Sequence, residues 1–317
     1  MSNVSKVMAA TGLIVLSFGL AGCQQGAAPA KAPEVVLQEG MAKLMEVSSN
    51  SYNVKVQGDL KGPQGETPEK LTFNFTASGS MEAKDAKDPK FNLNLKGDMM
   101  ADLDGGSGEA SFRMNKDAVY LSLMSLDGKG QVTIPEEMKA EFVGKWWTMP
   151  IPPEALDELA KSMPSSDTAN MTAEQKEMKA LLESTKFFKD VTYKGMESVG
   201  GEQSYHYTGA LDKVALTEFV GKAAELQGET VSADELAEMK TSLETFDFTG
   251  DFYVGQTSGV LNKIKGNLVL KASADGSSPS GTIALELMAS DFNKPVTVQV
   301  PADAQPIPLE ALGALPL

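Results

Sequence analysis

The stretch "YNVKVQGDL" (residues 52–60) alternates apolar or small side chains with polar ones. One side would carry Val54, Val56, Gly58 and Leu60, and the other side Asn53, Lys55, Gln57 and Asp59. Successive side chains of a β-strand point to opposite faces of its sheet. The stretch therefore predicts a strand with one buried face and one face in water.

The same alternation recurs along the chain. "LTFNFTASG" (71–79) and "FNLNLKGDM" (91–99) repeat it, and we expect further strands near 109–115, 118–125, 188–195, 203–211, 246–254, 260–272 and 281–292. Stretches rich in Pro, Gly, Asp and Lys at 61–69, 82–89 and 104–108 are expected to be turns. Strands that are apolar on one face only are typical of antiparallel sheets.

Helical periodicity separates these strands. Apolar residues recur at helical spacing in 37–45, 152–163, 172–185, 212–228 and 232–244. Thr172 with Gln175, and Ser232 with Glu235, match the capping box that begins a helix. A sandwich of two sheets would explain the alternation but would leave the helices without a partner. We therefore predict an α+β fold: a large curved antiparallel sheet, with helices near 152–185 and 212–245 on its concave side.

The N-terminus has the pattern of an export signal. One lysine precedes an apolar run at 7–20, which is shorter than the roughly 20 residues of a membrane-spanning helix. "LAGC" (20–23) resembles the lipobox of bacterial lipoproteins, whose cysteine is acylated after the signal is removed. The resemblance implies that Cys23, the only cysteine, anchors the protein to the outer face of a bacterial cell membrane or to the outer membrane. The alternative is an ordinary signal peptide with an incidental cysteine.

Four parts of the chain follow from this reading. We expect a signal peptide at 1–22, the acylated cysteine with a flexible tether at 23–33, a single domain at 34–307 and a tail at 308–317. The tether would keep the domain near the membrane, because ten extended residues reach at most about 35 Å.

Composition excludes several functions. The net charge of −15 argues against nucleic acid, and the single histidine argues against histidine-rich metal sites. On a strand, His206 would point away from Tyr205 and Tyr207, and no Gly-x-Ser-x-Gly motif supplies a nucleophile. "DLDGGSGE" (102–109) fits a hairpin turn better than a calcium loop. We expect no enzyme activity, no cofactor and no bound metal.

Several longer stretches resemble the LolA/LppX-like bacterial lipoproteins, which include the lipid-binding LppX and LprG type. They are "YKGMESVGGEQSYHYTGALDK" (193–213), "FTGDFYVGQTSGVLNKIKGNLVL" (248–270), "VGKWWTMP" (143–150) and "ASDFNKPVTVQVPADAQPI" (289–307). The resemblance implies a half-open β-barrel with helices on its concave side, in which several members hold acyl chains or lipids. This chain is longer than the compact carriers, chiefly near 152–185.

Candidate ligand contacts follow from the helix stripes and the tryptophan pair. The stripes could line a cavity or simply belong to the core, and the adjacent tryptophans would face opposite ways on a strand. The candidates are Met178, Leu182, Phe219, Leu236, Met239 and Trp146. The first hypothesis is a membrane-anchored protein that binds a lipid or other hydrophobic ligand and carries it across the envelope. The alternative is a sensor or interaction module that binds an envelope protein.

Overall fold

The computed structural model describes residues 29–63, 69–85, 87–156, 171–228, 231–272 and 278–307. The expected signal peptide, Cys23 and the tail at 308–317 lie outside these ranges, as does most of the expected helix at 152–163. The single domain at 34–307 stays a prediction.

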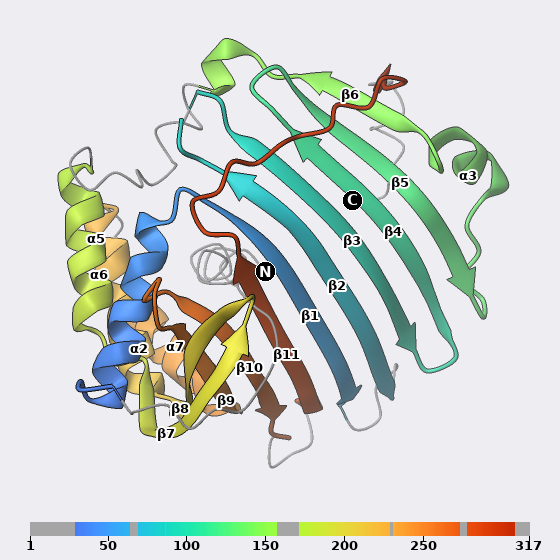
Figure 1. The fold of residues 1–317 in the computed structure, drawn as a ribbon. Helices are drawn as coiled ribbons and strands as arrows, with labels where there is room; N and C mark the ends of the chain where they lie inside the picture. The colour runs from blue at the N-terminus through green and yellow to red at the C-terminus, as the bar shows by residue number, and fades with distance from the viewer. Residues whose placement is uncertain are drawn as a thin grey trace.

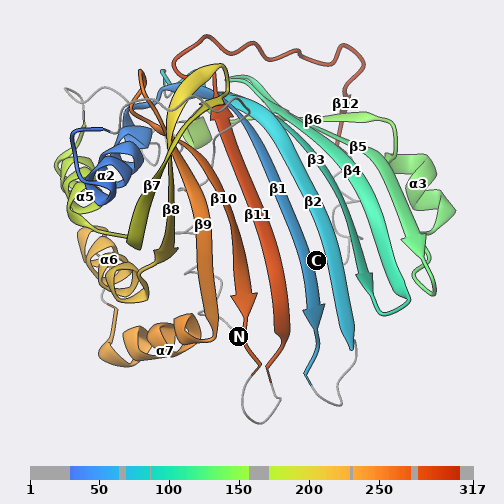
Figure 2. The same cartoon turned by 60° about the horizontal axis from the view of Figure 1, so that its bottom comes forward.

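One curved, open sheet dominates the described residues (Figures 1 and 2). Its order is β12-β6-β5-β4-β3-β2-β1-β11-β10-β9-β8-β7, and every neighbouring pair is antiparallel except β12 with β6. The strands are β1 (Ser49–Lys61), β2 (Lys70–Glu82), β3 (Lys90–Ala101), β4 (Asp104–Met114), β5 (Ala118–Lys129), β6 (Trp146–Pro150), β7 (Phe188–Val199), β8 (Glu202–Leu211), β9 (Phe246–Gly255), β10 (Leu261–Leu270), β11 (Ser280–Ser290) and β12 (Gln305–Pro306). The predicted large curved antiparallel sheet is confirmed.

The glycine-rich stretch 104–108 was expected to be a turn, and this prediction is wrong. These residues begin β4, and the turn lies at Asp102 and Leu103. Asp102 has a φ of 55°, and its carboxylate accepts hydrogen bonds from the backbone N–H groups of Glu69 and Lys70. Two side-chain interactions of one aspartate therefore hold the turn, while the glycines remain free to pair with β3.

The strand register places most of the apolar side chains of the long strands on one face of the sheet. Phe112 lies opposite Leu93, Leu93 opposite Gly79, Gly79 opposite Tyr52, and Tyr52 opposite Ala289. Directly paired residues of antiparallel strands share a face. We call this side the apolar face. Further members, by the same register, are Val54, Val56, Phe73, Phe75, Leu95, Met99, Leu121, Trp147, Tyr207, Phe252 and Leu287.

Four of the described helices lie at the β7–β10 end of the sheet (Figures 1 and 2). α2 (Pro33–Ala42) contacts β7, β9 and β10, α5 (Ala173–Ser184) contacts α2, and α6 (Lys213–Leu226) contacts α5. α7 (Ala233–Glu244) contacts α6 and β9. Both predicted capping boxes are present, at Thr172 and Ser232. The short 3₁₀ helix η2 (Lys43–Glu46) follows α2, and α3 (Glu136–Phe142) lies beside β5, far from the other helices.

The main core lies between α2 and the β7–β10 part of the apolar face. Leu37 and Met41 of α2 pack there against Tyr207 and Phe252, which are both 0% exposed. Burying each such side chain contributes about 1.5–3 kcal/mol. The sheet beyond β10 has no comparable cover among the described helices. Within the described ranges, no helix is both long enough and apolar enough to cross a bilayer.

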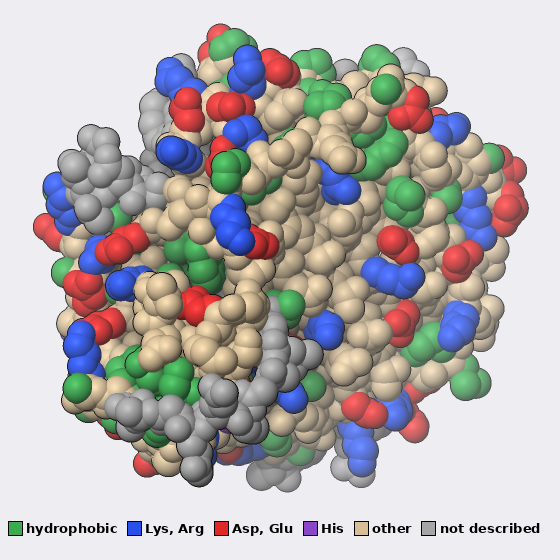
Figure 3. All heavy atoms as spheres, viewed as in Figure 1, with side chains coloured by type: hydrophobic (Ala, Val, Ile, Leu, Met, Phe, Trp, Pro, Cys, Tyr) green, Lys and Arg blue, Asp and Glu red, His purple; other side chains and the backbone are tan. Residues whose placement is uncertain are grey.

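A C-terminal strap (residues 291–307) crosses the opposite face of the sheet, which we call the polar face (Figure 1). Its backbone is held by Glu82, which accepts from the N–H of Val296 at 2.7 Å, and by Asn92, which donates to the Thr297 carbonyl at 3.2 Å. The strap ends at β12 beside β6. Figure 3, drawn from the same side, shows few hydrophobic side chains over β1–β4.

Candidate functional site

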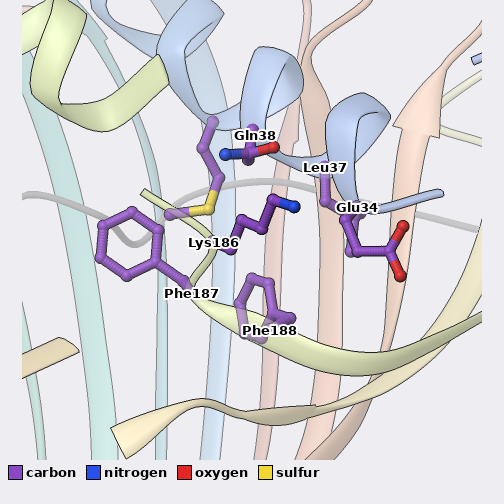
Figure 4. A pocket seen from close by; sticks show the side chains of 7 residues that line it. Glu34, Leu37, Gln38, Lys186, Phe187 and Phe188 are labelled. Carbon is purple, nitrogen blue, oxygen red and sulfur yellow. The ribbon is translucent and has the colours of Figure 1, made fainter. Parts of the chain in front are cut away.

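The pocket beneath α2 is too small to be the ligand site. Leu37, Gln38 and Met41 face Lys186, Phe187 and Phe188 across it, and Glu34 lies at its side (Figure 4). Its volume is ≈ 10 Å³, which is about the space that one water molecule needs. Pockets for drug-sized ligands measure about 300–1,000 Å³.

The helix residues that the sequence suggested as ligand contacts serve different parts of the packing. Leu182 and Phe219 pack against the main core, where the Phe219 ring lies 4.8 Å from that of Phe187. Leu236 approaches Gly221, so it packs α7 against α6. Met178 and Met239 are half-buried on α5 and α7. Among the described residues, these five side chains do not line the pocket beneath α2.

The two tryptophans lie on opposite faces of β6, as the strand pattern predicted. Trp146 pairs with Ser122 on the polar face, and the Arg113 guanidinium lies 5.6 Å from the centre of its ring. Trp147 pairs with Leu121 on the apolar face. The sheet therefore separates the candidate Trp146 from the apolar face. Its neighbour Trp147 is the tryptophan that lies on the apolar face.

A large part of the apolar face carries exposed hydrophobic side chains. From β2 to β6, the exposed fraction is 45% for Phe75, 45% for Leu95, 46% for Met99, 41% for Leu121 and 48% for Met149. Exposed apolar surface that continues over several strands marks a site for a ligand, a protein or a membrane. We take this β2–β6 part of the apolar face as the candidate site and call it the open apolar face.

Aromatic rings lie over glycines of neighbouring strands in this region. A β-carbon added to Gly97 would meet the Phe75 ring at 2.1 Å, and one added to Gly58 would meet the Phe73 ring at 2.2 Å. The two rings lie 5.7 Å apart. Each ring therefore covers a glycine on a neighbouring strand, where no side chain stands in its way.

Sequence reasoning missed this site because it expected the ligand between the helices and the concave side of the sheet, and placed most candidate contacts on the helices. The alternation pattern identifies which residues share a face, but it does not show which part of that face a helix covers. One usable signal was present: Gly79 and Gly97 fall at apolar positions of strands that also carry phenylalanine. Such positions indicate that a neighbouring ring lies over the backbone.

A charged cluster lies on the polar face of β7–β11. His206 Nδ1 is 3.0 Å from a Glu197 carboxylate oxygen, and His206 Nε2 is 2.7 Å from Asp251. The imidazole stacks on the Tyr253 ring at 4.4 Å, and burial raises the pKa of Tyr253. His206 thus faces away from Tyr205 and Tyr207, as predicted. Among the described residues, no three His, Cys, Asp or Glu side chains are arranged to hold a metal ion.

No protein-family model and no curated protein matches the chain. Solved structures do match. The lipoprotein LppX of Mycobacterium tuberculosis has 14% identity and a TM-score of 0.30, and the match covers 85% of this chain and 100% of LppX. LprF of Mycobacterium bovis has 12% identity, a TM-score of 0.35 and coverage of 87% and 100%. A DUF1329 family protein of Desulfovibrio piger has 10% identity, a TM-score of 0.19 and coverage of 86% and 96%. LppX, from the family that the sequence resembles, is thus among the solved structures that this chain matches.

Proposed function

We propose that the protein is an exported, membrane-anchored lipoprotein that binds a lipid or similar hydrophobic ligand on the open apolar face. The observation that carries this proposal is the run of exposed apolar side chains from Phe75 to Met149. Binding of this kind needs no covalent chemistry, because burial of the acyl chain supplies the free energy.

The geometry favours a lipid with more than one acyl chain. Each buried methylene contributes about 0.8 kcal/mol, and a flat face covers only one side of a chain. A chain of about sixteen carbons, half covered, would therefore gain about 6 kcal/mol before the cost of lost motion. One chain would be held weakly, whereas two or three chains side by side would also cover each other.

The lipid anchor at Cys23 would place the face near a source of such ligands. Cys23 lies outside the described residues, and its acylation remains part of the proposal. Diacylglyceryl and N-acyl chains would give the two or more chains that stable anchoring requires. The tether to residue 33 would then keep the face close to the membrane, where it could take up a lipid and carry it across the envelope.

Mass spectrometry of bound lipid tests the proposal. The full-length protein is purified from its host, washed in detergent-free buffer and extracted with organic solvent. We expect acyl lipids in the extract at a fixed molar ratio to protein, beyond the protein's own thioether-linked anchor. A variant with Leu95→Lys should lose most of them. An extract that is lipid-free in the parent would contradict the proposal and favour the alternative, a module that binds an envelope protein.

A further inference from the structure

Trp147 has a buried donor that finds no acceptor in the part of the chain that the structure describes. The residue is 8% exposed, and its indole Nε1 is buried with no hydrogen-bond partner there. Most buried polar groups in proteins are hydrogen-bonded, and leaving one unpaired costs free energy. An unpaired indole N–H at a candidate ligand site therefore points to an acceptor that the ligand supplies.

The position of Trp147 fits this role. It pairs with Leu121, which is 41% exposed, and it shares a face of β6 with Met149, which is 48% exposed. The indole therefore lies at the β6 border of the open apolar face. The Tyr207 hydroxyl is also unpaired, but this residue is 0% exposed and belongs to the packed core beneath α2.

The side chain that flanks Trp147 belongs to a lightly held element. The Phe142 ring lies 5.7 Å from the Trp147 ring and comes from the end of α3. α3 is seven residues long and has no buried residue, in contrast to α2, where six are buried. The Phe142 ring therefore flanks Trp147 from an element that is not part of the main core.

We infer that Trp147 is a specificity-determining residue that donates a hydrogen bond from Nε1 to a carbonyl oxygen of the bound lipid. This inference rests on the proposed function. The ligand class is then an acyl ester, with its ester group at the β6 border and its chains running over β5 to β2. A ligand without that carbonyl would leave the donor unpaired, and sites built around a buried donor discriminate against such ligands.

A matched pair of lipids tests the inference. A diacylglycerol and the dialkylglycerol of the same chain lengths differ in the two carbonyl groups, because the second has ether links. Each lipid displaces a fluorescent hydrophobic dye from the parent, from Trp147→Phe and from Trp146→Phe. Phenylalanine keeps an aromatic ring but has no N–H, and Trp146 on the polar face provides the control position.

We expect Trp147→Phe to bind the ester lipid about tenfold more weakly than the parent and the ether lipid as tightly as the parent. Trp146→Phe should bind both lipids as the parent does. Equal binding of the ester lipid by Trp147→Phe and the parent would overturn the inference, as would an equal loss for both lipids. If the parent binds neither lipid, the proposed function itself is wrong.

A spectroscopic measurement keeps the test independent of the stability of Trp147→Phe. In Trp146→Phe, Trp147 is the only tryptophan left in the chain. Its indole N–H proton resonance should move downfield when the ester lipid is added, and it should move less with the ether lipid. An equal shift with both lipids would contradict a hydrogen bond to the carbonyl.

Discussion

Leu95→Lys should abolish most of the ligand binding while leaving the fold intact. Leu95 lies between Ala77 of β2 and Ala110 of β4 and is 45% exposed. A ligand that covers this exposed half would gain about 1 kcal/mol from it, because a whole buried leucine is worth about 1.5–3 kcal/mol. Lysine removes that gain and forces the ligand to desolvate an ammonium group or to shift, at a further cost of about 1 kcal/mol or more.

The sum of about 2 kcal/mol corresponds to roughly thirtyfold weaker binding, measured as Kd by dye displacement. The aliphatic stem of lysine can still cover the two alanines, so the free energy of unfolding should change by less than about 1 kcal/mol. Asn74→Lys is the control. It adds the same charge on the polar face, where Asn74 pairs with Asp98 of β3, and it should leave the Kd unchanged. Equal losses in both variants, or none in Leu95→Lys, would refute the assignment of the open apolar face.

Three further predictions concern the core, the charges and the anchor. Leu37→Ala removes a side chain that is 1% exposed in the main core and should lower the free energy of unfolding by about 2–5 kcal/mol in urea; a loss below about 1 kcal/mol would contradict the packing of α2. Hydrogen bonds from the ammonium groups of Lys213 and Lys271 lower the pKa of Asp247 to about 2, below the unfolded value near 3.9. The stabilising contribution of the ionised Asp247 carboxylate is therefore present above about pH 4 and is lost as the pH falls toward 2. Lys213→Met should raise the pKa of Asp247 in a carboxyl NMR titration. An unchanged pKa would exclude the ion pair in solution. Cys23→Ala should prevent incorporation of labelled fatty acid in the host, and labelling that persists would exclude the lipobox.

Much of the sheet could be predicted from the sequence because the alternation within each long strand shows which of its two faces is buried. The period-two alternation in 52–60, 71–79 and 91–99 arises because one face of each strand is buried and the other meets water. Any antiparallel sheet with one wet face gives the same pattern. The capping boxes at Thr172 and Ser232 are equally local, since a side chain and a backbone N–H three residues apart suffice. The β4 start at 104–108 could not be predicted, because glycines carry no alternation and pair through the backbone alone.

The candidate site was harder to predict because it depends on which part of the apolar face the helices cover, and this is set by tertiary packing. Leu182 and Phe219 have the same apolar character as Leu95 and Met149, yet the first two pack in the core and the last two are exposed. No local pattern distinguishes these pairs. The distinction arises because α2, α5, α6 and α7 all gather at the β7–β10 end. The opposite orientation of the two tryptophans, in contrast, follows from strand geometry alone.

The most direct test of the account is contact quenching of each tryptophan by a lipid with brominated acyl chains. Trp146→Phe leaves only Trp147, on the apolar face, and Trp147→Phe leaves only Trp146, on the polar face. We predict that the saturating brominated lipid strongly quenches the fluorescence of Trp147 and leaves that of Trp146 nearly unchanged. Stronger quenching of Trp146, or quenching of neither tryptophan by a lipid that demonstrably binds, would contradict binding on the open apolar face.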